Sequence, residues 1–513
     1  MRQLGATDAS FLYMETPQTP MHVGGLYLFE LPAGREGRFH DDFKAHIASR
    51  LHRAPIFSQK LAPMPQEVDP LGMQHPLWVD AGEVDLDYHV RRSGLPRPGT
   101  LEQLEELVGR LHSNLLDRGR PLWEFTVIDG LQSGHAALYM KMHHAAIDGG
   151  AAMALTQAIY DTTPQPPQID APATAPATAS PPHPLALLGV AYAGYLRQQV
   201  RNLQMIPDAW KALAKVVLPD AQTLQYQPPA RLPPAAPPTV LNGTITGQRV
   251  FAARSARLDD AKKIVKLTGA KLNDVVLAAC AGALRRYLQD KDALPAQPLT
   301  AFVPVSLREA GNAEMNNQVF GMICSLATDV AEPLARLRAI VESSRQAKQL
   351  TGTLKDVVPR DEMAPGAPLL LQGLMGLYGR STRPERVPVA ANVTISNVPG
   401  PAVALYAAGA KMLTMYPVSI PTHGNALNIT VQSYDGALEL GLTACRRTVP
   451  QVGLLADYVV EALGELKTAV LGQDVKEATA APPAAPAASP AKAPRRVRQA
   501  SKKAPSRPGR VRT

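Results

Sequence analysis

The chain has 513 residues, too many for one typical domain, and its 45% apolar and 19% charged residues are typical of a globular protein with sizeable cores. The net charge of +9 does not indicate a basic groove on the folded body, because residues 491–513 hold nine Lys or Arg and no acidic residue. Without that stretch, 44 basic residues balance 44 acidic ones.

The three cysteines, Cys280, Cys324 and Cys445, are far apart, odd in number and flanked by apolar residues. This argues against a disulfide framework and for a reducing, cytosolic compartment, and the chain has no Cys-x-x-Cys pair to suggest structural zinc. The first residues lack the apolar core of a secretory signal. The most apolar windows, 184–195 and 368–379, are too short to span a bilayer. We therefore expect no signal peptide and no transmembrane helix.

The first part of the chain mixes short apolar runs with amphipathic stretches. The apolar runs predict strands at 22–31, 123–129 and 135–144. Apolar residues at i, i+3 and i+4 predict helices at 41–53 and 101–116, and another helix begins near Gly149. Pro-rich stretches at 161–184 and 225–239 then enclose a helical segment at 196–217.

The same mixture resumes near residue 240. Apolar patterns predict strands at 247–258, 300–308, 317–329, 392–400 and 425–445. Helices are expected at 259–269, 273–290 and 451–470. Alternation on both sides of Asp435-Gly436 makes residues 425–445 the best hairpin candidate in the chain.

These elements predict an α/β fold (an α+β sandwich) with two halves of similar size and a site in the crevice between them. The expected domains are an N-terminal lobe at 1–160, a Pro-rich linker with a helical segment at 161–239, a C-terminal lobe at 240–472, and a disordered Pro/Ala/Lys/Arg-rich basic tail at 473–513.

The stretch "KMHHAAIDGG", residues 141–150, is the candidate site. Read as the end of a strand, it turns His143 and His144 to opposite sides, and a turn with Asp148 leads into the next helix. A histidine just ahead of a helix N-terminus feels positive potential, which favours the neutral imidazole that a general base requires. Asp148 is placed to brace the loop.

Other interpretations compete with the general base. An isolated pair of histidines is most often buried in a core, with the aspartate capping a helix. A metal site needs three or more ligands, and the other histidines form no second ligand motif. A serine triad lacks its Gly-x-Ser-x-Gly elbow.

The neighbouring motifs favour the catalytic interpretation. "HHAAIDG" fits the HHxxxDG signature of the coenzyme A-dependent acyltransferase superfamily, and the chain to about residue 471 most resembles the bacterial wax ester synthase/diacylglycerol acyltransferase family. The resemblance is carried in order by "TDASFLYME", "PMHVGGLY", "DRGRPLWEF", "LNDVVLAA", "FVPVSLR", "NNQVFGM", "NVTISNVPGP" and "NALNITVQSYDG".

The resemblance implies a role for each site residue. His144 would be the general base, His143 would support it, and Asp148 would hold the loop by an ion pair, with Arg308 as the candidate partner. Gly149 would permit the close approach of pantetheine.

The resemblance also assigns Asn273 and Asp274 to the family's Asn-Asp motif and to substrate binding, although the same pair would suit the N-cap of a helix at 273–289. Residues 121–123 match the family's "PLW", for which core packing is the preferred explanation.

The implied fold has two chloramphenicol-acetyltransferase-like lobes with mixed sheets and an interlobe channel. The implied activity is an O-acyltransferase that moves a long-chain acyl group from acyl-CoA to the hydroxyl of diacylglycerol, a fatty alcohol, or both, without a covalent intermediate. No metal and no cofactor are expected for this activity; acyl-CoA takes part as a co-substrate.

Two alternatives stay open. One is a condensation or polyketide-associated acyltransferase that takes a carrier-protein thioester, and the other is a non-catalytic protein that binds a lipid granule or DNA. In the preferred interpretation, the basic tail binds an anionic membrane or lipid-droplet surface, and nucleic acid is its less favoured partner. The expected location is the cytoplasm, peripherally at the inner face of the plasma membrane or on lipid inclusions.

Overall fold

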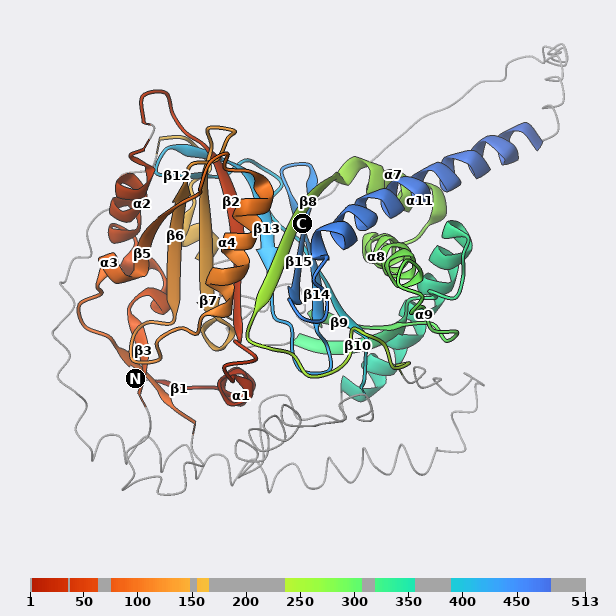
Figure 1. Cartoon of the computed structure of the whole chain (residues 1–513), viewed down its shortest axis with the longest axis horizontal. Helices are drawn as coiled ribbons and strands as arrows, with labels where there is room; N and C mark the ends of the chain where they lie inside the picture. The colour runs from red at the N-terminus through yellow and green to blue at the C-terminus, as the bar shows by residue number, and fades with distance from the viewer. Residues whose placement is uncertain are drawn as a thin grey trace, which may run out of the picture. The chain divides into compact units, whose positions relative to one another are not determined.

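The computed structural model describes residues 2–35, 37–62, 75–147, 155–165, 236–306, 319–355 and 389–480. The predicted helix at 196–217, most of the Pro-rich linker and residues 481–513 of the tail lie outside these ranges. Residues 1–471 form one compact unit. Two six-stranded sheets lie side by side in this unit (Figure 1).

The first sheet has the strand order β12-β13-β2-β7-β6-β5, and only β5 and β6 pair in parallel. Its strands are β2 (His22–Glu30), β5 (Val90–Gly94), β6 (Trp123–Asp129), β7 (Ala136–His143), β12 (Tyr406–Ala407) and β13 (Ala410–Val418). The predicted strands at 22–31, 123–129 and 135–144 are therefore confirmed as β2, β6 and β7.

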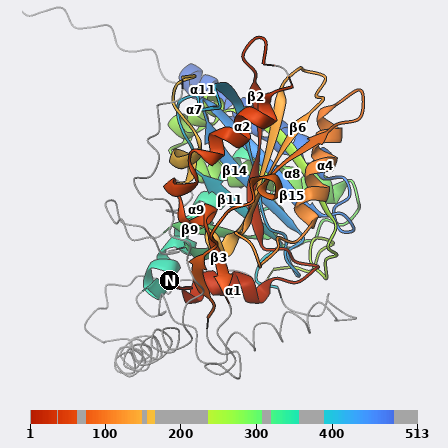
Figure 2. The same cartoon turned by 90° about the vertical axis from the view of Figure 1, so that its left-hand side faces the viewer.

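Helices cover both faces of this sheet, which explains why every residue of β7 is buried. Helix α2 (Phe39–Ala48) packs on the face that carries Leu138 and Met140, and α4 (Leu101–Ser113) packs on the face that carries Tyr139. Figure 2 shows the two helices on either side of the strands. Successive side chains of a strand point to opposite faces, so β7 needs apolar residues at consecutive positions.

Strands β12 and β13 come from the C-terminal part of the chain, although the sheet is otherwise built from residues before 150. Strand β13 pairs antiparallel with β2, with Pro417 opposite Gly25. A proline inside an apolar run argues against a strand, and residues 410–418 were not predicted as one. The N-terminal sheet is thus completed by a segment that lies more than 250 residues later in the sequence.

The second sheet has the order β10-β9-β11-β14-β15-β8, in which β11 pairs in parallel with β9 and β14. Its strands are β8 (Arg249–Arg257), β9 (Thr300–Ser306), β10 (Val319–Ser325), β11 (Val393–Val398), β14 (Leu427–Tyr434) and β15 (Ala437–Cys445). The predicted hairpin is confirmed, since Asp435 and Gly436 take φ values of 40° and 86° between β14 and β15. Positive φ at both central residues suits the right-handed twist of a two-residue hairpin.

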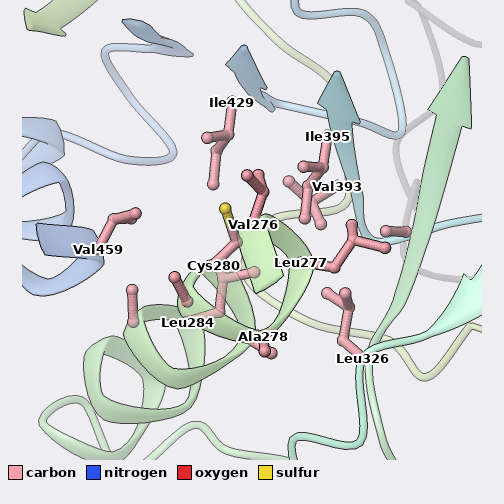
Figure 3. Packing of buried hydrophobic residues seen from close by; sticks show 14 of the residues in the cluster. Val276, Leu277, Ala278, Cys280, Leu284, Leu326, Val393, Ile395, Ile429 and Val459 are labelled. Carbon is pink, nitrogen blue, oxygen red and sulfur yellow. The ribbon is translucent and has the colours of Figure 1, made fainter. Parts of the chain in front are cut away.

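Four helices accompany the second sheet: α7 (Leu258–Thr268), α8 (Leu272–Gln289), α9 (Pro333–Lys355) and α11 (Val452–Ala480). Helix α8 is buried along most of its length, and Figure 3 shows Val276 and Cys280 on its side turned toward Ile395 and Ile429 of the sheet. Each fully buried aliphatic side chain of this kind contributes about 1.5–3 kcal/mol to folding.

The two sheets are joined by α4, which packs against β8. Gly109 allows this approach, because a Cβ atom at this position would lie 2.9 Å from the Arg249 carbonyl oxygen. Glu105 of α4 accepts hydrogen bonds of 2.8 Å each from the Ala253 N–H and from Arg254 Nη1, both on β8. The two halves of the predicted α/β fold are therefore packed against each other.

The small elements near the N-terminus complete the first half. Strands β1 (Arg2–Gln3), β3 (Gln59–Ala62) and β4 (Leu77–Asp80) form a three-stranded sheet, and α1 (Ala6–Met14) packs on the turn that follows β7. Among the described helices, none alone has the length and hydropathy to cross a bilayer; α7 and α8 reach them only as a pair bent by 108°.

Candidate active site

The histidine pair lies where β7 ends beside β2. His143 is the last residue of β7 and pairs with His22 of β2, while His144 begins a 3₁₀ turn, His144–Ala146. The His144 N–H donates a 2.9 Å hydrogen bond to the Met21 carbonyl oxygen. The strand therefore stops one residue earlier than the sequence predicted, and the turn, not strand alternation, sets the direction of His144.

His143 caps the turn that carries His144. Its Nδ1 accepts a 3.0 Å hydrogen bond from the Ala145 N–H, as a side-chain acceptor does at a helix N-cap. Because Nδ1 is the acceptor, the neutral ring carries its proton on Nε2. That Nε2 lies 3.2 Å from Glu15 Oε1, at an angle short of a well-aligned hydrogen bond. His143 is fully buried and contacts the turn from within the core.

His144 is less enclosed than its neighbour and keeps partial exposure. Its ring stacks on the ring of Phe11 from α1, with centroids 3.9 Å apart and planes 13° apart. Its Nδ1 is buried and has no hydrogen-bond partner in another described residue. Because Nδ1 is buried and Phe11 covers one face of the ring, the other ring nitrogen, Nε2, is the candidate atom for proton transfer.

Burial lowers the pKa of His144 from 6.5 to about 4, although a hydrogen bond with the residue's own backbone opposes the fall. The imidazole is therefore neutral at pH 7, the form that a general base needs. A helix N-terminus was the predicted cause of this neutral state; in the structure the main cause is the loss of hydration.

Glu15 is a site residue that sequence reasoning missed. It follows α1, its side chain is only 4% exposed, and its Oε1 lies 3.2 Å from Nε2 of both His22 and His143. Arg118 approaches the other oxygen, with Nη2 2.7 Å from Oε2. Glu15 lies within the quoted motif "TDASFLYME", but its distance from residue 143 in sequence gives no sign of this contact.

The remaining predicted site residues fall in two groups. Asp148, Gly149 and Arg308 lie outside the described residues, so their predicted roles stay predictions. Asn273 and Asp274 lie in the first turn of α8, in the second half of the fold.

The helix at this position begins one residue earlier than predicted, with Lys271 as the N-cap. Asp274 accepts a 3.1 Å hydrogen bond from the Lys271 N–H, as an acidic side chain does at the third position of a helix. Its Oδ1 is buried without a hydrogen-bond partner among the described residues.

Two further sequence expectations concern the surroundings of the site. Leu122 and Trp123, from the "PLW" match, are fully buried, which confirms core packing for both. Within the described part of the chain, no group of three His, Cys, Asp or Glu side chains is arranged to hold a metal ion.

Comparisons with known proteins identify the family of the chain. The family model for the wax ester synthase/diacylglycerol acyltransferase catalytic domain matches residues 4–276, and the model for the C-terminal domain of the same family matches residues 315–467. A protein of Mycobacterium tuberculosis assigned as a diacylglycerol O-acyltransferase is 40% identical over 466 residues, which cover 90% of this chain and 99% of that protein.

Solved structures give the same result for the fold. The wax ester synthase/diacylglycerol acyltransferase of Marinobacter aquaeolei VT8 is 34% identical, with a TM-score of 0.63 over 91% of this chain and 99% of that one. The first condensation domain of the calcium-dependent antibiotic synthetase shares the fold at 16% identity, with a TM-score of 0.54 over 91% and 96% of the two chains. The predicted chloramphenicol-acetyltransferase-like pair of lobes is confirmed, and the chain is an acyltransferase that belongs to the wax ester synthase/diacylglycerol acyltransferase family.

Proposed function

We propose that this enzyme transfers a long-chain acyl group from acyl-CoA to the hydroxyl of diacylglycerol, of a fatty alcohol, or of both, with His144 as the general base. The observation that carries the proposal is the state of the His144 ring, which is neutral, partly exposed and held by Phe11. Membership of a family named for these two products supports the choice of acceptors.

The chemistry needs one base and no covalent enzyme intermediate. An alcohol is a poor nucleophile at pH 7, whereas a thioester is an activated acyl donor. Nε2 of His144 takes the hydroxyl proton as the oxygen attacks the thioester carbonyl carbon. When the carbon–sulfur bond breaks, the imidazolium returns the proton to the thiolate, so coenzyme A leaves as a thiol and the base is restored. No metal or bound cofactor takes part in these reaction steps.

The low pKa of His144 affects both proton transfers. A base with a pKa of about 4 is unprotonated in nearly every molecule at pH 7, so it is always ready to accept the first proton. The same low pKa makes its conjugate acid a strong donor toward the departing thiolate, but it also makes the ring a weaker proton acceptor than a base with a pKa near 7. We assign the acyl chain and the acceptor to an interlobe channel that keeps out water, because water would otherwise compete as an acyl acceptor.

We further propose that residues 481–513 hold the enzyme at an anionic lipid surface. The stretch contains nine Lys or Arg and no acidic residue, and a basic residue near an anionic leaflet is worth about 1 kcal/mol. Such a tether would place a body without net charge beside its lipid acceptors and keep the enzyme at a membrane or lipid inclusion.

The experiment that tests the reaction is an acceptor panel with radiolabelled palmitoyl-CoA and the full-length purified chain. We expect labelled triacylglycerol or wax ester, with an equal amount of free coenzyme A, only when diacylglycerol or a fatty alcohol is present. Release of coenzyme A without any acceptor would instead identify a thioesterase. Transfer only from a carrier-protein thioester would favour a condensation-type enzyme.

Deletion of residues 481–513 tests the tether separately. The truncated chain should keep its turnover with detergent-dispersed acceptor and lose its salt-sensitive binding to vesicles that contain phosphatidylserine. Vesicle binding equal to that of the full chain would contradict the tether.

A further inference from the structure

Glu15 connects the two segments that hold His144. Its Oε1 accepts a 3.1 Å hydrogen bond from the Met21 N–H and lies 3.2 Å from Nε2 of His143. The carbonyl oxygen of the same Met21 accepts the His144 N–H at 2.9 Å, and His143 caps the turn in which His144 lies. The contacts thus form a closed circuit that runs from Glu15 to Met21, His144, His143 and back to Glu15.

The Glu15 carboxylate in this circuit is charged and almost fully buried. Burial alone would raise the pKa of Glu15, but the close approach of the His143 and His22 Nε2 atoms outweighs it and holds the pKa far below 4.5. Arg118 provides the formal counter-charge, with Nη2 at 2.7 Å and Nε at 3.1 Å from Oε2. A buried carboxylate is costly unless several donors surround it, as they do here.

Helix α1 adds a second contact from the same segment. Phe11, one turn before Glu15, stacks on the His144 ring, so the segment 11–15 touches His144 at the ring and supports its backbone through Glu15. Phe11 covers one face of the His144 ring. The backbone of the turn is held by two hydrogen bonds, from the His144 N–H to Met21 and from the Ala145 N–H to His143. Such support matters because an error of about 1 Å in the placement of a reacting group can cost about 10²-fold in rate.

We propose that Glu15 is a positioning residue for acyl transfer: with Arg118 as its counter-ion, it orients His143 and the Met21 peptide and thereby fixes His144 toward the acceptor hydroxyl. The inference rests on the proposed role of His144 as the base. Glu15 touches neither substrate in this proposal and acts only through its neighbours.

The test is Glu15→Gln in the full chain. The amide keeps the shape of the side chain but replaces an acceptor oxygen by a donor, so at least one of the N–H groups around it loses its partner. We expect kcat to fall about 10–100-fold, while the KM for palmitoyl-CoA stays within about twofold and the protein remains folded. A kcat within about twofold of wild type, or a change confined to KM, would overturn the proposal.

The matched control is Glu124→Gln. Glu124 is a mostly buried carboxylate on β6 that lies 3.2 Å from the buried Lys141 Nζ, and its side chain makes no contact with the His143–His144 pair among the described residues. The control should lower the melting temperature and leave kcat unchanged. An equal loss of kcat in both variants would show that Glu15→Gln acts through general destabilisation, against the proposal.

Two further measurements separate the possible failures. Combining Glu15→Gln with His143→Ala should cost much less than the product of the single effects, because both act on one turn; independent effects would refute the coupling. Histidine ¹⁵N spectra of the wild-type chain should show His143 protonated on Nε2, and an Nδ1–H ring would overturn the proposal even if no variant folds.

Loss of rate in His144→Ala with normal rate in Glu15→Gln rejects this inference alone, whereas full activity of His144→Ala rejects the proposed function itself.

Discussion

The pH dependence of kcat/KM distinguishes a His144 of lowered pKa from an ordinary surface histidine. With a pKa of about 4, roughly 90% of the enzyme still carries a neutral His144 at about pH 5, against nearly all of it at pH 7. A histidine with the usual pKa of about 6.5 would be about 76% neutral at pH 7 and about 3% neutral at pH 5. Lowering the pH from 7 to 5 should therefore reduce kcat/KM by only about a tenth, not by about 25-fold.

The assay should count radiolabelled lipid product from palmitoyl-CoA, because thiol reagents for coenzyme A lose sensitivity at low pH. Circular dichroism at each pH confirms that the enzyme stays folded. A rate that falls with an apparent pKa near 6.5, while the fold and substrate solubility are unchanged, would refute the argument that burial keeps the base neutral.

Two other predictions follow from single side chains. Phe11→Leu removes the stacked ring but keeps an apolar contact. Since aromatic pairs are worth about 0.5–1.5 kcal/mol, steady-state kinetics should show kcat reduced by about 2- to 12-fold, and an unchanged kcat would argue against a role for the stack. Glu439 is buried with its pKa raised to about 7, so its ionisation destabilises the fold increasingly as the pH rises from about 4.5 through 7. In urea unfolding, the free energy of unfolding of Glu439→Gln should therefore rise relative to that of the wild type by up to about 3 kcal/mol between pH 5 and pH 8. A difference in unfolding free energy that stays constant over this range would contradict the assigned pKa.

Local patterns in the sequence predicted most of the second sheet. The Asp435-Gly436 turn, the alternation around it and the helices at 259–269 and 273–290 depend on neighbouring residues, so periodicity identifies them. Helix α11 was predicted to end near 471 and continues to Ala480. Helix α9 was not predicted.

Long-range pairing was beyond the sequence. Strand β13 contains Pro417, and only its antiparallel partner β2 explains why residues 410–418 are extended. The domain boundaries at 160 and 240 stay predictions, and the placement of β12 and β13 shows that chain order alone does not determine which strands share a sheet.

The site shows the same division. The motif identified His143 and His144, and the turn at His144–Ala146 explains why the two side chains differ: one caps the turn from inside the core, and the other keeps partial exposure. The contact with Glu15 joins residues 128 positions apart and could not be inferred from spacing. The low pKa of His144 also arises from burial, a tertiary property.

Single-turnover acyl transfer by His144→Ala, with both substrates saturating, tests the central claim most directly. If His144 is the base, the rate should fall by about 10²–10⁴-fold while the melting temperature stays near that of the wild type, and His143→Ala should lose less activity. A His144→Ala rate equal to that of the wild type would contradict the account.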